Sequence, residues 1–318
     1  MDQKISDSID ARAAARWAQS THVSKAATPW LHDEVGARVA ERLEMLQLQP
    51  TAWANWHYPR GGGALQLALQ QRWPQALAYC PSSNTIDNIA TQEGLTAKNS
   101  KNIPKNALNE GPWSAGLRRI KQAWGSKSGS AQDALPPTES VQCIVSNMQL
   151  HSHAQPQYLF ESWHSSLATD GLIFFSCLGP DTLRPLQNLY RTLNWPPPLQ
   201  RLVDMHDWGD ALVNAGFATP VMEMERIQLS YSSAEALLAE LRELGRNLAP
   251  QRFAGLRGKA WRATLLAELE KLKAADGRIY MPFEIVYGHA FKPRPQITGE
   301  TSVSLDALRL TLPSRKTP

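Results

Sequence analysis

A run of three glycines is the first place in this sequence where the backbone could hold a ligand. Gly61, Gly62 and Gly63 follow a short apolar segment that predicts a strand at 52–57, and they precede a segment that predicts a helix at about 64–72. Glycine lets the backbone approach a ligand closely, and the first turn of a helix presents free N–H groups. A glycine run is equally typical of an ordinary turn, so the spacing alone leaves both interpretations open.

Histidines and cysteines raise the question of a metal site. His151 and His153 are two residues apart and have no third ligand nearby, which favours a surface or substrate-pocket position over metal binding. Cys80, Cys143 and Cys177 form an odd set without any CxxC spacing. That pattern argues against a disulfide framework and against zinc, so we predict no metal.

A second polar cluster begins at Asp204 and continues with His206, Asp207 and Asp210. Asp204 precedes a predicted helix, where an aspartate is a favourable N-cap. His206 and Asp210 share one face of that helix. The pattern favours capping and helix-start electrostatics, and a role for His206 at the rim of a pocket stays open.

These residues depend on a scaffold in which apolar segments alternate with amphipathic ones. The alternation favours an α/β fold, with a mainly parallel sheet and helices on both faces. Such sheets bind ligands beyond the carboxyl ends of their strands. Strands are predicted at 52–57, 76–80, 141–145, 171–177, 221–231 and 280–291, and helices at 30–48, 64–72, 155–167, 206–215, 232–246 and 258–274.

Length and composition suit one large domain, with 318 residues of which 42% are hydrophobic. We predict a flexible N-terminal segment over 1–29, one domain over 30–293 and a flexible tail over 294–318. Within the domain, 81–139 shows no sustained period and is predicted to be irregular, with one helix at about 113–124. The two helices of 232–276 are predicted to form a cap.

Charge and hydropathy bear on compartment and partners. No apolar run approaches the roughly 18–20 residues that span a bilayer, and Met1–Asp10 contains no apolar core of a signal peptide. We therefore expect a cytoplasmic protein without membrane partners. The net charge of +4 suits an acidic partner or nucleic acid. Because no nucleic-acid-binding motif is found, a nucleic-acid-binding module has only the charge in its favour.

Four segments of the C-terminal half carry a resemblance. They are Phe175–Arg184, which contains Gly-Pro-Asp-Thr-Leu, followed by Val203–Leu212, Ala215–Glu225 and Glu284–Pro293. In this order they resemble the malonyl-[acyl-carrier protein] O-methyltransferases of biotin synthesis, a family of class I S-adenosylmethionine (SAM) methyltransferases. Ser146-Asn147-Met148 resembles the family's Ser-Asn-Leu. The resemblance is good over about 140–293 and weak over about 30–75.

The resemblance implies a Rossmann-like seven-stranded sheet with an antiparallel last strand. It also implies SAM as cofactor and an acyl-carrier-protein thioester as substrate. The cofactor-binding residues it implies in this sequence are Gly61, Gly62, Gly63, Ser82, Asn147 and Met148.

The cofactor side departs from the family's pattern. Alignment on Arg72-Trp73-Pro74 places His57 where the family has an acid, and Pro59 where it has the first glycine. The acid that ends the family's second strand is replaced here, by Ser82 in our alignment. Asp133 is a candidate for the family's acid near the adenine, although a loop aspartate is the simpler interpretation. A non-catalytic relative that has lost SAM and serves as a binding or regulatory protein is therefore the alternative to an active methyltransferase.

Methylation of a carboxylate requires alignment of donor and acceptor and exclusion of water, but no general base, because the carboxylate is already ionised. Arginine suits this task because its fork binds both carboxylate oxygens. Arg184 and His206 are the catalytic candidates, with a surface position as the alternative for Arg184.

A basic stretch without any acid covers 244–267. Acyl carrier proteins are strongly acidic, and the family inserts helices between its sixth and seventh strands, so this stretch is a candidate docking surface. An ordinary solvated face is the alternative. The residues concerned are Arg246, Arg252, Arg257, Lys259 and Arg262.

Overall fold

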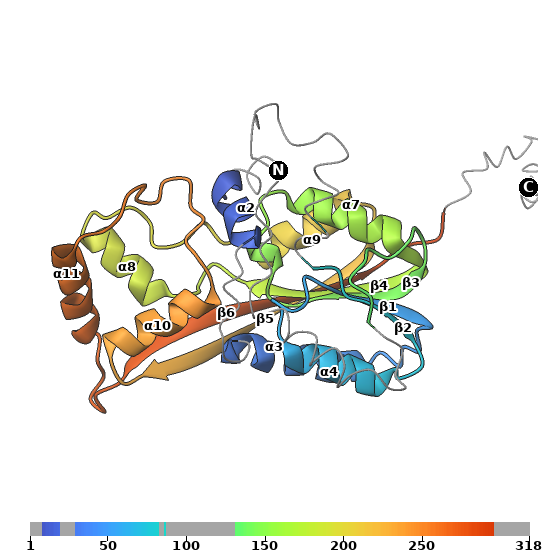
Figure 1. Cartoon of the computed structure of the whole chain (residues 1–318), viewed down its shortest axis with the longest axis horizontal. Coiled ribbons are helices and arrows are strands. Elements are labelled where there is room, and N and C mark those ends of the chain that lie inside the picture. The colour runs from blue at the N-terminus through green and yellow to red at the C-terminus, as the bar shows by residue number, and fades with distance from the viewer. Residues whose placement is uncertain (1–7, 20–28, 83–85, 87–130, 296–318) are drawn as a thin grey trace, which may run out of the picture.

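A computed structural model describes residues 8–19, 29–82, 86 and 131–295. These residues form one twisted sheet of six strands in the order β2-β1-β3-β4-β6-β5 (Figure 1). The strands are β1 (Ala52–Trp56), β2 (Leu77–Tyr79), β3 (Val141–Ser146), β4 (Leu167–Leu178), β5 (Ala218–Tyr231) and β6 (Ile279–Phe291).

Strand direction confirms the predicted topology. β2, β1, β3 and β4 pair in parallel, whereas β6 runs antiparallel to both β4 and β5. Of the seven strands expected, the described residues contain six. Gln132 forms an isolated parallel bridge with Tyr79 on the outer side of β2, and the expected helix at 113–124 lies outside the described residues.

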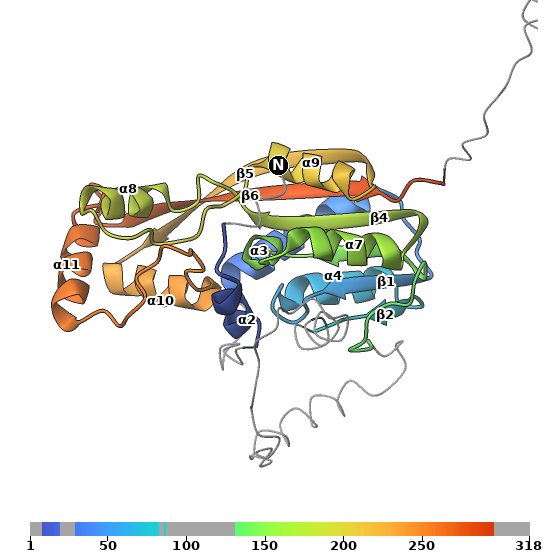
Figure 2. The ribbon, with the colours of Figure 1, turned by 90° about the horizontal axis from the view of Figure 1, so that it is seen from above.

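Helices cover both faces of the sheet, as predicted (Figures 1 and 2). α3 (Trp30–Glu44) and α4 (Gly63–Arg72) lie on one face, and α7 (Pro156–Ser166) and α9 (Met205–Asn214) lie on the other. The central strand β3 is almost continuously apolar because it is buried on both faces.

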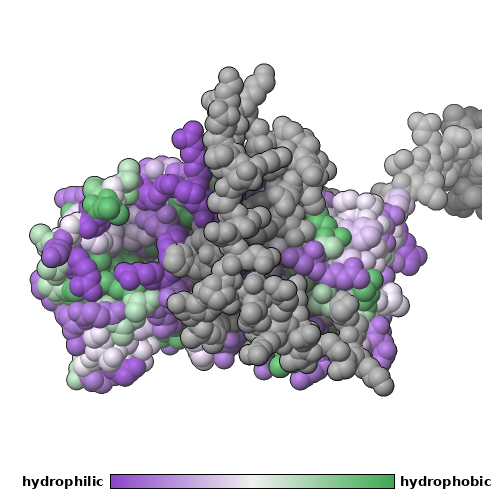
Figure 3. Space-filling view, viewed as in Figure 1, coloured by the Kyte–Doolittle hydropathy of each residue, from purple (hydrophilic) through white to green (hydrophobic). Residues whose placement is uncertain are grey.

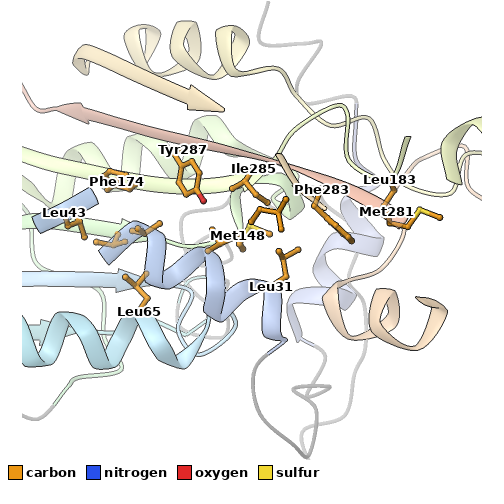
Figure 4. Packing of buried hydrophobic residues seen from close by; sticks show 14 of the residues in the cluster. Leu31, Leu43, Leu65, Met148, Phe174, Leu183, Met281, Phe283, Ile285 and Tyr287 are labelled. Carbon is orange, nitrogen blue, oxygen red and sulfur yellow. The ribbon is translucent and has the colours of Figure 1, made fainter. Parts of the chain in front are cut away.

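The core has a separate layer on each side of the sheet. On the first face, Leu31 and Leu43 of α3 and Leu65 of α4 lie in one cluster with Phe174, Phe283 and Tyr287 of the sheet (Figure 4). The second layer contains Trp163, Trp208 and Cys177. Trp208 and Cys177 are 2% and 0% exposed, so both are core residues.

The last two strands extend beyond the rest of the sheet and carry the cap. β4 pairs with β6 only from Leu172–Phe291 to Leu178–Ile285, whereas β5 follows β6 as far as Ile279. α8 (Arg184–Thr192), α10 (Ala234–Leu244) and α11 (Lys259–Glu270) surround this extension (Figure 2). Leu237, Leu265 and Leu269 bury their side chains in the same cluster as Ile279, and burial of each leucine stabilises the fold by about 1.5–3 kcal/mol.

The segment Gly179–Leu183 ties the cap to the sheet. Gly179 N donates to the carbonyl oxygen of Glu284 at 2.8 Å, and Leu183 N donates to that of Pro282 at 2.7 Å. A Cβ atom at Gly179 would lie 2.8 Å from the Glu284 side chain, so a larger residue there would require that side chain to move. The segment that carries the family resemblance therefore joins the end of β4 to β6 through its backbone hydrogen bonds.

One helix appears where a flexible segment was expected. α2 (Ala11–Gln19) lies between the cap helices and the body of the protein in both views (Figures 1 and 2). Ala13 and Ala14 pack on Leu248 of the cap, and Asp10 forms an ion pair with Arg252 at 2.7 Å. The sequence has no long apolar period here because Ala13 and Ala14 are the buried residues of this helix, and hydrogen bonds from Asp10 N to Leu248 O and from Arg60 to Trp17 O also hold it. No helix among the described residues is long and apolar enough to span a membrane.

Candidate functional site

The glycine loop after β1 turns sharply into α4. His57 has a left-handed backbone conformation (φ 64°) and is buried, and the Tyr58–Pro59 peptide bond is cis. Gly62 has φ 105°, a conformation that favours glycine. A Cβ atom at Gly61 would lie 2.8 Å from the carbonyl oxygen of Asn147. The glycines are therefore required for the loop to approach the turn after β3.

Asn147 holds three segments together at this point. Its Nδ2 donates to the carbonyl oxygen of His32 at 2.8 Å and also to that of Gly61, and its Oδ1 accepts from Ser176 Oγ at 2.6 Å. Ser176 Oγ in turn accepts from Met148 N at 3.1 Å. Since Asn147 is completely buried, these bonds fix α3, the glycine loop and β4 relative to one another.

A carboxylate reaches the end of β2 from another part of the chain. Ser82 N donates to Asp133 Oδ1 at 2.9 Å. The neighbouring Gln132 N donates to the carbonyl oxygen of Ala78 in β2, and its own carbonyl oxygen accepts from Cys80 N, just after β2. Asp133 is exposed. The carboxyl end of β2 therefore has an acid beside it although its own sequence contains none there.

Four histidines lie around the ends of β1 and β3, of which His32 and His57 are buried and His151 and His153 are partly exposed, and all four have lowered pKa values. Burial is the largest cause for each of His32, His57, His151 and His153, and it lowers the pKa of His151 to about 3. The rings of His57 and His153 are 5.8 Å apart between centroids. These side chains are therefore neutral at pH 7. Among the described residues, no group of three or more His, Cys, Asp or Glu side chains is arranged to hold a metal ion.

A pocket lies where α2, the start of α3, the glycine loop, the turn after β3 and the end of α10 meet. It brings the cofactor candidate Met148 next to the cap residue Arg246. The lining residues are Trp17, Pro29, His32, Pro59, Arg60, Met148, Gln149, His151, Ser152, Gln200, Glu243, Leu244, Gly245, Arg246 and Leu248.

The two catalytic candidates from the sequence lie elsewhere. Arg184 is half-exposed and forms an ion pair with Asp181, whose other carboxylate oxygen binds Arg226 at 2.8 Å. The backbone N of His206 donates to the side chain of Asp204 at 2.9 Å, which confirms Asp204 as the N-cap of α9. Neither Arg184 nor His206 lines the pocket, and their catalytic role stays a prediction.

The basic residues of the cap have different surroundings. Arg246 lines the pocket, and Arg252 is paired with Asp10. The guanidinium of Arg257 lies over the ring of Phe253, 3.8 Å from its centroid, and also contacts Trp261. Lys259 and Arg262 are exposed on α11, and Arg257, just before this helix, is partly exposed.

Sequence reasoning singled out Gly61–Gly63, Asn147 and Met148, which the fold brings together, but it missed Trp17 and Arg60. The guanidinium of Arg60 lies 4.6 Å from the centre of the Trp17 ring, and its Nη2 donates to the carbonyl oxygen of Trp17 at 2.7 Å. An arginine directly before the glycine run is the signal that could have pointed to this position.

A sheet of this order, with an antiparallel last strand and a glycine loop beyond its first strand, defines a class I SAM-dependent methyltransferase. No protein-family model matches the chain. The malonyl-[acyl-carrier protein] O-methyltransferase of Gallionella capsiferriformans is 35% identical over 272 residues, which cover 85% of this chain and 87% of the relative. The protein of the same name from Nitrosospira multiformis is 38% identical over 280 residues, covering 85% and 86%. The chain belongs to the malonyl-[acyl-carrier protein] O-methyltransferase family.

Proposed function

We propose that this protein transfers a methyl group from SAM to the free carboxylate of a malonyl group carried by an acyl carrier protein, a step of biotin synthesis. The observation that carries the proposal is the similarity to relatives of that name along 85% of the chain. The pocket between the glycine loop and the cap supports it, because donor and acceptor must meet there.

Two features of the described residues fit SAM. Asp133 places a carboxylate beside Ser82 at the end of β2, where the ribose hydroxyls of the cofactor would need acceptors. His57 Nδ1 is buried at the end of β1 and has no hydrogen-bond partner in the described part of the chain. We assign cofactor binding to Gly61, Gly62, Gly63, Ser82, Asn147 and Met148, with Asp133 in support.

The chemistry requires little from the protein beyond positioning. When bound, the cofactor would supply a transferable methyl group on a positively charged sulfur, and Gly61, Gly62, Gly63 and Met148 would hold it. The acceptor carboxylate is already ionised at neutral pH, so no proton has to be removed. The chain's residues orient the carboxylate and exclude water.

A direct assay tests the function. Purified protein is incubated with SAM and malonyl-acyl carrier protein, and the mass of the carrier protein is followed for the gain of one methyl group. Calorimetric titration with SAM runs in parallel. Transfer together with saturable SAM binding is expected. No SAM binding and no transfer would favour the alternative of a relative that has lost its cofactor.

We further propose that the exposed end of the cap binds the carrier protein. Phe253 is 45% exposed and Leu256 is fully exposed, Arg257 lies over the Phe253 ring, and the exposed Lys259 and Arg262 follow a few residues later in the sequence. Hydrophobic and hydrophilic residues alternate over this end of the molecule (Figure 3). A surface with apolar residues inside a cationic border suits an acidic protein partner. Arg246 and Arg252, which also belong to the predicted docking set, lie towards the pocket and α2.

Charge reversal separates docking from simple solvation. Lys259→Glu, alone and with Arg257→Glu, should weaken carrier-protein binding, and the loss should shrink as salt is added. Lys271→Glu is the matched control, because Lys271 is an exposed lysine that follows the same helix and pairs with Glu268. Equal effects of Lys259→Glu and Lys271→Glu would refute the docking surface.

A further inference from the structure

A chain of hydrogen bonds links the sheet to the cap along the pocket. Leu178 N, at the end of β4, donates to His151 Nδ1 at 3.3 Å, and the carbonyl oxygen of His151 accepts from Gln200 Nε2 at 3.1 Å. Gln200 Oε1 accepts from Leu248 N at 3.3 Å, and the carbonyl oxygen of Leu248 accepts from Asp10 N at 2.8 Å. Because His151, Gln200 and Leu248 all line the pocket, this chain forms part of its wall.

Gln200 is the side chain that bridges the two halves of this chain of bonds. It is 7% exposed, and its amide oxygen and amide nitrogen both bind backbone atoms of segments that are far apart in the sequence. A buried amide with a partner at each end is confined to one orientation, because the loss of either bond would leave a buried polar group without a partner. Gln200 therefore fixes the spacing of the two segments that it joins.

These two segments belong to opposite sides of the pocket. The turn after β3 that contains His151 begins with Asn147 and Met148, which are cofactor candidates. The stretch 245–248 follows α10 of the cap and lines the pocket on the other side. Leu248, at the end of this stretch, also packs on α2. Loss of the bond between Gln200 and His151 would therefore let the cap side of the pocket move relative to the cofactor side.

We propose that Gln200 is a positioning residue for methyl transfer, which holds the cap side of the pocket at the distance from the cofactor side that aligns donor and acceptor. The inference rests on the proposed function and adds a residue to it. Methyl transfer to an ionised carboxylate needs no proton transfer, so its rate depends on alignment. A displacement of about 1 Å is enough to lower such a rate roughly 100-fold, even where each ligand still binds.

Gln200→Glu tests this role. It keeps the shape of the side chain and the acceptor for Leu248, but an oxygen replaces the donor that faces the carbonyl oxygen of His151. The methyl-transfer rate is measured in a single turnover with SAM and malonyl-acyl carrier protein both at saturation, and calorimetry gives the Kd of each ligand separately. We expect the rate to fall roughly 10- to 100-fold, while both Kd values stay within about threefold of those of the unsubstituted protein.

Two further variants separate positioning from a general loosening of the fold. Gln200→Met is uncharged and loses both hydrogen bonds, so it should lower the rate to a similar extent, and it decides the question if Gln200→Glu does not fold. Asn247→Asp is the matched control. Asn247 Nδ2 donates to the carbonyl oxygen of Pro197 at 2.7 Å, and its Oδ1 accepts from Ala249 N at 2.9 Å, so this variant also loses one donor and keeps its acceptor. Asn247 does not line the pocket, so the rate should stay within about threefold.

Unchanged rates in both Gln200 variants would overturn the assignment. Equal losses of rate in Gln200→Glu and Asn247→Asp would do the same, because Gln200 would then act only through the stability of the cap. A Kd that rises by as much as the rate falls would also overturn it, because Gln200 would then act in ligand binding. Failure of the proposed function is distinguishable, because the unsubstituted protein itself would then transfer no methyl group, and the positioning role would fall with it.

Discussion

Asn147 offers the sharpest test of how the cofactor loop is held. Asn147→Asp keeps the size of the side chain but replaces its Nδ2 donor with an oxygen. The carbonyl oxygens of His32 and Gly61 then face an acceptor in a fully buried position. Ser176 still donates to the remaining oxygen, so the loss is confined to two hydrogen bonds.

The magnitude follows from those two bonds. A buried polar group left without its partner costs about 1–3 kcal/mol, so the expected loss is about 2–6 kcal/mol. A domain of this size loses about 2–4 °C of melting temperature per kcal/mol, which gives a decrease of roughly 5–20 °C. SAM binding should weaken as well, because the same bonds position Gly61 and Met148.

The stability of Asn147→Asp should change with pH in a definite direction. Burial beside carbonyl oxygens raises the pKa of the new carboxyl above its unfolded value of about 3.9. The folded state then holds its proton to higher pH than the unfolded state, so the free energy of unfolding falls as pH rises above about 4. The deficit relative to the unsubstituted protein should therefore be larger at pH 8 than at pH 5.

Thermal melts at both pH values, with calorimetric titration of SAM, check these expectations. Asn188→Asp is the control, because Asn188 is exposed on α8 and its Oδ1, which accepts from Arg191, is retained. If Asn147→Asp and Asn188→Asp have the same melting temperature at pH 8, the hydrogen-bond reasoning is wrong.

Three further predictions concern the scaffold. Gly288→Ala places a Cβ atom 2.6 Å from Phe175 Cε1, so it should lower the free energy of unfolding by about 1–3 kcal/mol in denaturant melts. Gly258→Ala is the control, because its Cβ atom would have no neighbour within 4 Å. Equal denaturation midpoints for the two variants would contradict this. Asp204→Ala removes the N-cap of α9 and should lower the free energy of urea unfolding by about 0.5–2 kcal/mol, and an unchanged value would exclude the cap. Burial lowers the pKa of His151 to about 3, whereas the same side chain has a pKa of about 6.5 in the unfolded state. As the pH falls from 6 to 4, only the unfolded state binds this proton, so His151 should lower the free energy of unfolding by about 1.4 kcal/mol per pH unit. His151→Gln should remove that part of the slope, and parallel pH profiles would refute it.

The fold could be predicted where side-chain periodicity reflects burial. Val35, Val39 and Leu43 recur at helical spacing in the sequence, and all three are fully buried on α3. α8 was not predicted, although Leu186, Leu189 and Tyr190 recur at helical spacing and pack on one core cluster. The helix has only nine residues, and a proline stands in its first turn.

The site was harder to predict because its parts converge from distant segments. The glycine run pointed to Gly61, and the resemblance of Ser146-Asn147-Met148 to the family's Ser-Asn-Leu pointed to Asn147. The meeting of Arg60 with Arg246 at the Trp17 ring depends on how α10 packs against α2, which no local pattern records. The same holds for Asp133, whose approach to Ser82 depends on the isolated bridge at the edge of β2.

The long β6 strand makes the sheet and the cap one folding unit. Its half inside the sheet pairs with β4, while Ile279, Met281 and Phe283 are buried beneath the cap helices. Deletion of the cap would expose those apolar side chains on an unprotected ribbon, which would promote aggregation. The amide protons of β6 should therefore exchange only through cooperative unfolding of both parts, and protection should be uniform along the strand.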